Sequence, residues 1–389
     1  MTNRFHLSIG NTLTAIALLA LLGGCRGPEG PAGPPGESTI LQLDGFAPGI
    51  KCGSCHNPDT DTVYYVWAKK YQWERSKHFF GGEFERNQAP CSGCHTTEGY
   101  VQRMLRGNPP LTSANWAGVV TSHPNASPPG CFACHSPHSR GNFSLRTTAP
   151  VTPVSPTTAA IPAIDYGKGN LCISCHQPRP MSPVLPVSPA ATDSVTITTS
   201  RWHPHYGVQS TMLAGVGGFQ IPGYTYTGNS PHATLPAIKQ EGCVICHMAP
   251  STVGSGIAGD HTMNVRFINL SGVEAWNVNG CLRSGCHATM TSVENYVSTS
   301  STLTGGMGVR KYVSMYLDTL FTELVRRNYI VPTTGLVNAS TTRPLRIPAR
   351  KAGALYNYFF LKHDFSMGMH NSKYAIELLR SSIEEIRKP

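Results

Sequence analysis

The stretch Gly242-Cys243-Val244-Ile245-Cys246-His247-Met248 contains the motif that recurs along the chain and decides its interpretation. Two cysteines separated by two residues and followed at once by histidine form the attachment motif of c-type haem. The cysteine sulfurs bond the former vinyl groups of the porphyrin, and the adjacent imidazole binds the iron. The pattern recurs at Cys52, Cys55 and His56, at Cys91, Cys94 and His95, at Cys131, Cys134 and His135, and at Cys172, Cys175 and His176.

A sixth copy is stretched, with four residues between Cys281 and Cys286 before His287. The six motifs use twelve of the thirteen cysteines. A disulfide framework would not require histidine after every second cysteine, and disulfide scaffolds are much shorter chains. Zinc sites pair one Cys-x-x-Cys with another pair or with spaced histidines. The sequence therefore predicts six haem c groups, each with a proximal histidine from its own motif.

Composition agrees with a chain that surrounds cofactors. A length of 389 residues would ordinarily suggest two domains, but porphyrins can supply much of an apolar interior. Aromatic residues make up 8% and charged residues only 13%, while there are 39 glycines and 31 prolines. Such a composition predicts a loop-rich polypeptide. The formal net charge of +10 would be offset by haem propionates, so it gives no reason to expect a nucleic-acid partner.

The N-terminus has the features of an export signal. Residues 1–24 carry one arginine and then an apolar run too short to span a bilayer, as in a secretory signal peptide. Leu22-Gly23-Gly24-Cys25 resembles the lipobox of bacterial lipoproteins, which implies that Cys25 is lipidated and, with Arg26 following, that the chain is sent to the outer membrane. The alternative is an ordinary signal peptide followed by an unpaired thiol. Residues 25–43 contain a collagen-like Gly-x-y run and are expected to be an extended tether.

Residues 44–300 are predicted to be the six-haem-binding region. A short helix is expected over Thr62–Trp73. Two stretches rich in Thr, Ser, Pro and Ala, 144–169 and 178–200, are expected to be surface loops with little regular structure. Residues 301–389 are predicted to be helices that pack on the haems: 308–329 from apolar residues at helical spacing, then Ala349–Lys362 and Ser372–Ile386.

The motif set, and the order of histidines between Trp202 and Met263, resemble the exported multihaem c-type cytochromes of metal-reducing bacteria. The stretch Asp364–Asn371, with Gly-Met-His-Asn before a helix, resembles the closing element of the nitrite-reductase-like multihaem superfamily. The resemblance implies a multihaem cytochrome c fold: mainly α with irregular loops, little β-structure, wrapped around six haems. It also implies distal iron ligands, the candidates being His78, His138, His205, His232, His261 and His370, with His123 and His203 as further candidates. His363 is expected to be solvated or structural.

Three functions remain open from the sequence. Nine histidines remain outside the motifs and His6, enough to give every iron a second imidazole and leave no site for substrate. This favours an electron-transfer protein with no catalytic residues, working at the outer membrane with other redox proteins, a porin-cytochrome conduit or extracellular acceptors. A reductase of nitrite, hydroxylamine or a sulfur oxyanion would need one open haem, and the Cys-x-x-Cys-Lys motif of ammonia-forming nitrite reductases is missing. A filament-forming cytochrome is the third possibility.

Overall fold

The computed structural model describes residues 56–389 apart from 82, 90, 110–124, 137–142, 253–255, 284, 291–292, 295 and 298–300. The predicted signal 1–24, Cys25 and the tether 25–43 therefore lie outside the described residues. The same is true of Cys52 and Cys55 of the first motif and of the distal candidates His123 and His138.

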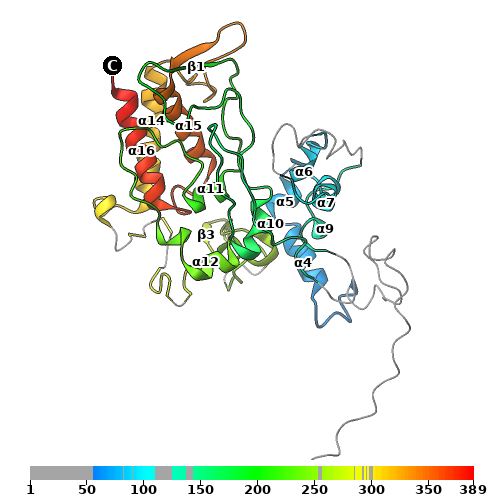
Figure 1. The fold of residues 1–389 in the computed structure, drawn as a ribbon. Coiled ribbons are helices and arrows are strands. Elements are labelled where there is room, and N and C mark those ends of the chain that lie inside the picture. The colour runs from blue at the N-terminus through cyan, green and yellow to red at the C-terminus, as the bar shows by residue number, and fades with distance from the viewer. Residues whose placement is uncertain are drawn as a thin grey trace, which may run out of the picture.

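Helices, 3-10 turns and a few short strands alternate with long irregular segments (Figure 1). The helices are α4 (Val66–Trp73), α5 (Lys77–Phe80), α6 (Ser92–His95), α7 (Thr97–Leu105), α9 (Cys131–Cys134), α10 (Asn170–Ile173), α11 (Gln209–Ala214), α12 (Pro236–Glu241), α13 (Val244–His247), α14 (Val309–Arg326), α15 (Ala349–His363) and α16 (Ser372–Arg387). The 3-10 turns are η1 (Glu83–Glu85), η2 (Gly167–Gly169), η3 (Pro231–Ala233), η4 (Asp260–Thr262) and η5 (Ser301–Leu303). The strands are β1 (Ser194–Ile197), β2 (Arg266–Ile268), β3 (Glu274–Trp276) and β4 (Leu345–Pro348).

The prediction of a mainly α chain with little β-structure, wrapped around six haems, is wrong. The fold is mixed, 37% helical and 7% strand, with two small antiparallel sheets. β1 pairs with β4 so that Val195 lies opposite Ile347, and β2 pairs with β3 in a local hairpin. β1 falls inside the 178–200 stretch that was expected to be a surface loop. Its side chains alternate between exposed and buried, which is the pattern of a half-buried strand.

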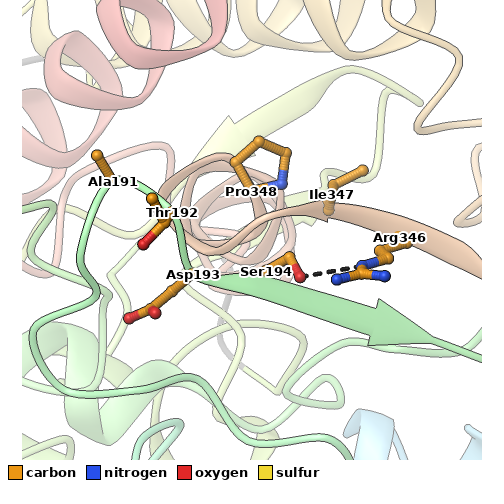
Figure 2. Close-up of a pocket in the computed structure, with 7 residues that line it drawn as sticks. All are labelled: Ala191, Thr192, Asp193, Ser194, Arg346, Ile347 and Pro348. Carbon is orange, nitrogen blue, oxygen red and sulfur yellow. Dashed lines mark hydrogen bonds between the residues drawn. The ribbon is translucent and has the colours of Figure 1, made fainter.

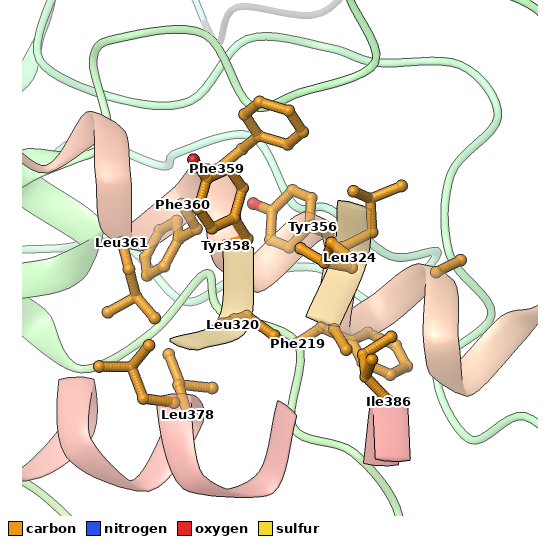
Figure 3. Close-up of a cluster of buried hydrophobic side chains, with 14 of the residues drawn as sticks. Phe219, Leu320, Leu324, Tyr356, Tyr358, Phe359, Phe360, Leu361, Leu378 and Ile386 are labelled. Carbon is orange, nitrogen blue, oxygen red and sulfur yellow. The ribbon is translucent and has the colours of Figure 1, made fainter. Parts of the chain in front are cut away.

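The predicted C-terminal helices are confirmed as α14, α15 and α16, within a few residues of the expected ends. They pack against one another around the largest apolar core of the described residues, which also takes in Phe219 from the middle of the chain (Figure 3). α15 is buried along almost its whole length because it lies between the other two helices and the segment around Phe219. This core is made by protein side chains, which is a further reason why a wholly haem-centred description fails.

Gly353 in α15 permits the closest approach in this core. A Cβ atom added at Gly353 would lie 2.0 Å from Cδ1 of Phe219, whose backbone N–H and C=O are both held by the Asn357 side chain. Since Phe219 cannot move freely, Gly353→Ala is expected to lower the free energy of unfolding by roughly 1–3 kcal/mol, despite the better helix propensity of alanine. Chemical denaturation followed by far-UV circular dichroism measures this. An unchanged midpoint would mean that the Phe219 ring repacks without cost.

Two smaller apolar clusters lie around the cysteine motifs. Tyr100, Ala133 and Leu171 form one, against which Cys134 and Cys175 pack. The other cluster packs against Cys246 and joins residues of the 144–169 stretch to the elements that carry the fourth and fifth motifs: Val151, Ile164, Tyr166, Ile173, Leu213, Ile238 and Ile245. The Thr/Pro-rich stretch is therefore partly a structural element, and Val151 and Ile164 exchange backbone hydrogen bonds within it.

Candidate haem-binding site

Each described cysteine motif is closed by the same backbone hydrogen bond. The N–H of the motif histidine donates to the carbonyl of the first motif cysteine in all five: His95 to Cys91 (3.2 Å), His135 to Cys131 (2.8 Å), His176 to Cys172 (2.9 Å), His247 to Cys243 (2.9 Å) and His287 to Cys281 (2.9 Å). A single helical turn places residues three and four apart on one face. In the four regular motifs, the turn therefore brings both cysteines and the histidine to one side.

The stretched sixth motif keeps this closure. Its two extra residues are absorbed in a second turn, in which the N–H of Cys286 donates to the Arg283 carbonyl at 3.0 Å and Gly285 has φ +80°. That conformation is one which glycine adopts without steric cost. The stretched motif thus shares with the regular motifs the hydrogen bond from the histidine N–H to the carbonyl of the first cysteine, closed over two more residues.

Five motif histidines each face a second histidine from elsewhere in the chain. The separations between ring centres are 6.1 Å for His176 and His78, 6.2 Å for His95 and His205, 6.3 Å for His135 and His261, 6.4 Å for His247 and His370, and 5.7 Å for His287 and His232. We call these the five histidine pairs. Five of the six distal candidates from the sequence are the second members, and the sixth, His138, lies outside the described residues.

The separation within the pairs suits a metal ion held between two imidazoles. A metal–imidazole bond is about 2.0 Å long, so two opposed Nε2 atoms on one metal lie about 4 Å apart, and their ring centres about 6 Å apart. In the His232–His287 pair the two Nε2 atoms are 3.5 Å apart. The ring separation alone does not distinguish the pairs from packed rings, since Tyr356 and Phe360 in the apolar core have centres 6.0 Å apart. What distinguishes the five pairs is that each joins a motif histidine to a histidine far away in the chain.

Hydrogen bonds on the outer ring nitrogens orient several of these imidazoles. Nδ1 of His232 donates to the Met369 carbonyl at 2.7 Å, and Nδ1 of His247 donates to the Met263 carbonyl at 3.1 Å. A carbonyl can only accept, so each of these rings carries its proton on Nδ1 and keeps Nε2 unprotonated, the form in which it can bind a metal ion. A hydrogen bond from the outer nitrogen to a carbonyl is the usual support of a metal-binding histidine.

Burial favours the neutral, ligand form of the paired rings. Desolvation is the main cause that lowers the pKa of His78, His247 and His261 to about 4, and that of His205 to about 3. In His370 burial also lowers the pKa, but the charge and the hydrogen bond of Asp364 outweigh it, so that the pKa is raised. Neutral imidazole is the form that binds metals.

Cysteines of different motifs lie close enough to influence one another's pKa, and these neighbours give the order of the motifs in space. The thiol of Cys175 is the main cause that lowers the pKa of Cys94 to about 7. The thiol of Cys172 is the main cause that lowers the pKa of Cys243. Cys246 lies within electrostatic range of the sixth motif. The second, fourth, fifth and sixth motifs therefore form a row, an order the sequence did not predict.

His203 and His363 have a different role from the paired histidines. Neither faces a motif histidine; instead they hold the backbone of His205, which has φ +71°. The N–H of His205 donates to Nδ1 of His203 at 3.0 Å, and Nδ1 of His363 donates to the carbonyl of His205 at 3.0 Å. His203 was a further distal candidate in the sequence, and in the structure it positions His205. His363 is buried rather than solvated.

Two charged residues beside the pairs were missed from the sequence. Asp364 lies against His370, and Arg103, only 1% exposed, lies at the contact of the second and fourth motifs. Nη1 of Arg103 donates to the Ser174 carbonyl at 2.8 Å and lies 3.3 Å from Sγ of Cys94. Its Nε and Nη2 have no partner within the described part of the chain. An arginine at i+9 from a motif cysteine gives no recognisable sequence pattern.

Other features of the described residues add no second site. Figure 2 shows an open pocket between β1 and β4, lined by residues 191–194 and 346–348, where Arg346 donates to the Ser194 hydroxyl at 3.1 Å. It contains no motif cysteine and no paired histidine. Within the described ranges, no three His, Cys, Asp or Glu side chains cluster as a metal site, and no helix is both long and apolar enough to cross a membrane.

Comparison with known proteins leaves the five histidine pairs as the main guide to what the chain does. No family model, no curated protein and no solved structure matches this chain.

Proposed function

We propose that this chain is a multihaem c-type cytochrome that transfers electrons, with haem bound through thioethers at the six cysteine motifs. The observation that carries the proposal is that five motif histidines each face a second histidine at nearly the same ring separation, 5.7–6.4 Å. A haem iron takes only its two axial ligands from protein, so the lack of a cluster of three ligands among the described residues is compatible with it.

The pairs favour electron transfer over catalysis. Haem bound at such a pair supplies a redox-active iron whose axial positions are both filled, with none left for substrate. The polypeptide would set the spacing between neighbouring haems, because Cys94 of the second motif lies near Cys175 of the fourth, and Cys172 of the fourth lies near Cys243 of the fifth. As expected from the export signal and Cys25, we propose that it works at the outer membrane with other redox proteins as partners.

The test is to produce the full chain in a host that attaches c-type haem and to measure three properties. Intact mass and pyridine haemochrome absorbance count covalent haems, and six are expected. Low-temperature EPR of the oxidised protein is expected to show only low-spin iron, and carbon monoxide should leave the reduced spectrum unchanged. A high-spin signal of about one haem in six that responds to carbon monoxide would support the reductase.

A mass without haem would overturn the proposal entirely. Disulfide formation is the competing chemistry, because Cys94 has Cys175 as a neighbour and Cys172 has Cys243, so oxidation of these thiols would link different motifs. Such a product would be two hydrogen atoms lighter for each bond and colourless, which the same mass spectrum distinguishes from haem attachment.

A further inference from the structure

The outer nitrogen of His370 has an unusual partner. Nδ1 of His370 lies 2.6 Å from Oδ1 of Asp364, whose side chain is only 1% exposed. The second oxygen, Oδ2, accepts from the hydroxyl of Ser366, and Oγ of Ser366 in turn accepts from the N–H of His370 at 3.2 Å. Within the described part of the chain, Asp364 forms no ion pair with lysine or arginine. The imidazole of His370 is therefore hydrogen-bonded to the buried carboxylate of Asp364.

Other members of the pairs have neutral groups at this position where the structure defines a partner. Nδ1 is hydrogen-bonded to a backbone carbonyl in His135, His232 and His247, to an amide oxygen in His176 and to a tyrosine hydroxyl in His287. Asp260 lies near His261, but it is partly exposed and paired with Lys69 at 3.6 Å. Of the six paired histidines whose Nδ1 partner the structure defines, His370 is the one bonded to a buried carboxylate.

Helix stability does not explain this carboxylate. Asp364 is the C-cap residue of α15, where the partial negative charge of the helix end disfavours an acidic side chain. Burying a carboxylate is also costly unless its hydrogen bonds compensate for lost water. The helix end and the burial therefore both disfavour an ionised carboxylate at residue 364. The hydrogen bond to His370 is the interaction that accounts for an aspartate there.

We propose that Asp364, acting through His370, lowers the reduction potential of the haem held by His247 and His370. The inference rests on the function proposed above. A carboxylate that accepts the Nδ1 proton increases the electron density on Nε2, and strengthens its bond to ferric iron more than to ferrous iron. The fixed negative charge also favours the more positive oxidised iron, and more so away from water. Since the fifth motif lies between the fourth and sixth, the row has a low-potential site in its interior.

Asp364→Asn tests the charge while keeping an acceptor oxygen for His370. In a spectroelectrochemical titration of the fully loaded protein, one haem is expected to gain at least tenfold in its equilibrium constant for reduction, about 59 mV for one electron. The other haems should not shift. EPR should show all irons low-spin, with the spectrum of one changed. Asp260→Asn is the matched control, since it removes a partly exposed, ion-paired acid beside another pair, and less than a twofold change is expected.

Ser366→Ala gives a second test with the opposite sign. Without the Ser366 hydroxyl, the Asp364 carboxylate binds the His370 proton more strongly, so the same haem is expected to become harder to reduce, by twofold or more in its equilibrium constant. This keeps the inference testable if Asp364→Asn fails to load haem. Unshifted potentials in loaded Asp364→Asn, or a Ser366→Ala shift in the positive direction, would refute the role of Asp364 and leave the proposed function standing. A wild-type chain without haem would refute both.

Discussion

His232→Ala is expected to open one iron. In the structure Nε2 of His232 is 3.5 Å from Nε2 of His287, and η3 presents it on a loop that the side chain of Asn371 holds through the N–H of Ser230 at 2.9 Å. If these two rings bind one haem, alanine removes the axial ligand but leaves both cysteines of the sixth motif in place. One iron then becomes five-coordinate and high-spin, while the others stay low-spin.

EPR spin quantification and carbon monoxide difference spectra measure this effect. About one haem equivalent of high-spin iron and of carbon monoxide binding is expected, and added imidazole should restore the low-spin state because it can occupy the vacated place. Thr234→Ala is the control: Thr234 lies two residues from His232, but it is exposed and its hydroxyl donates to the Pro231 carbonyl at 3.4 Å, so all irons should remain low-spin. A His232→Ala spectrum identical to the wild type would show that His232 is not a ligand.

Local patterns in the sequence predicted local structure well. Apolar residues predicted α14, α15 and α16, because α14 and α16 bury one side against the common core and α15 is buried on nearly every side. Strand β1 was missed since Val195 and Ile197 sit in a stretch dominated by Thr, Ser and Pro, and since the partner β4 is far away in the chain. Strand pairing of this kind depends on tertiary contacts more than on local propensity.

The same distinction between local patterns and long-range contacts applies to the candidate site. The motif cysteines and histidines follow from spacing alone, and the resemblance to multihaem cytochromes supplied His78, His205, His232, His261 and His370 as partners. Which partner faces which motif is a matter of tertiary structure, so the sequence could not predict it. That haem iron lies between the facing rings remains a prediction.

Residues that support the pairs carry no pattern. In the sequence, Asp364 is an acidic residue that follows a helix and Arg103 is a cation with no recognisable motif around it. The structure shows that both side chains are buried. The sequence left His203 as a further ligand candidate and gave His363 a solvated or structural place, but it did not indicate that both hold the peptide groups of His205. Such supporting contacts are non-local, and residue type alone does not indicate them.

Gly242→Ala is expected to disrupt the contact between the fourth and fifth motifs. Gly242 precedes Cys243 and has φ +58°, ψ −133°, a conformation that residues with a Cβ rarely adopt. An added Cβ would also lie 2.6 Å from Cα of Gly169 and 2.8 Å from the Tyr166 carbonyl, both backbone atoms that cannot turn aside. Backbone strain of about 1–3 kcal/mol and steric overlap of about 1–3 kcal/mol act together here, so this substitution should be among the most damaging single-methyl changes.

Two further glycines separate the causes. Gly169→Ala introduces the overlap alone: its φ is −63°, and its Cβ would lie 2.8 Å from Cα of Gly242. Gly272→Ala introduces the strain alone, since its φ is +75° with nothing within 4 Å of the added atom. Denaturation midpoints and haem content should therefore fall most in Gly242→Ala. Of the two single-cause variants, only Gly169→Ala should also lose haem, because the Gly169–Gly242 contact is what brings Cys172 against Cys243. Equal haem content in all three would mean that the motifs are held together by something other than this backbone contact.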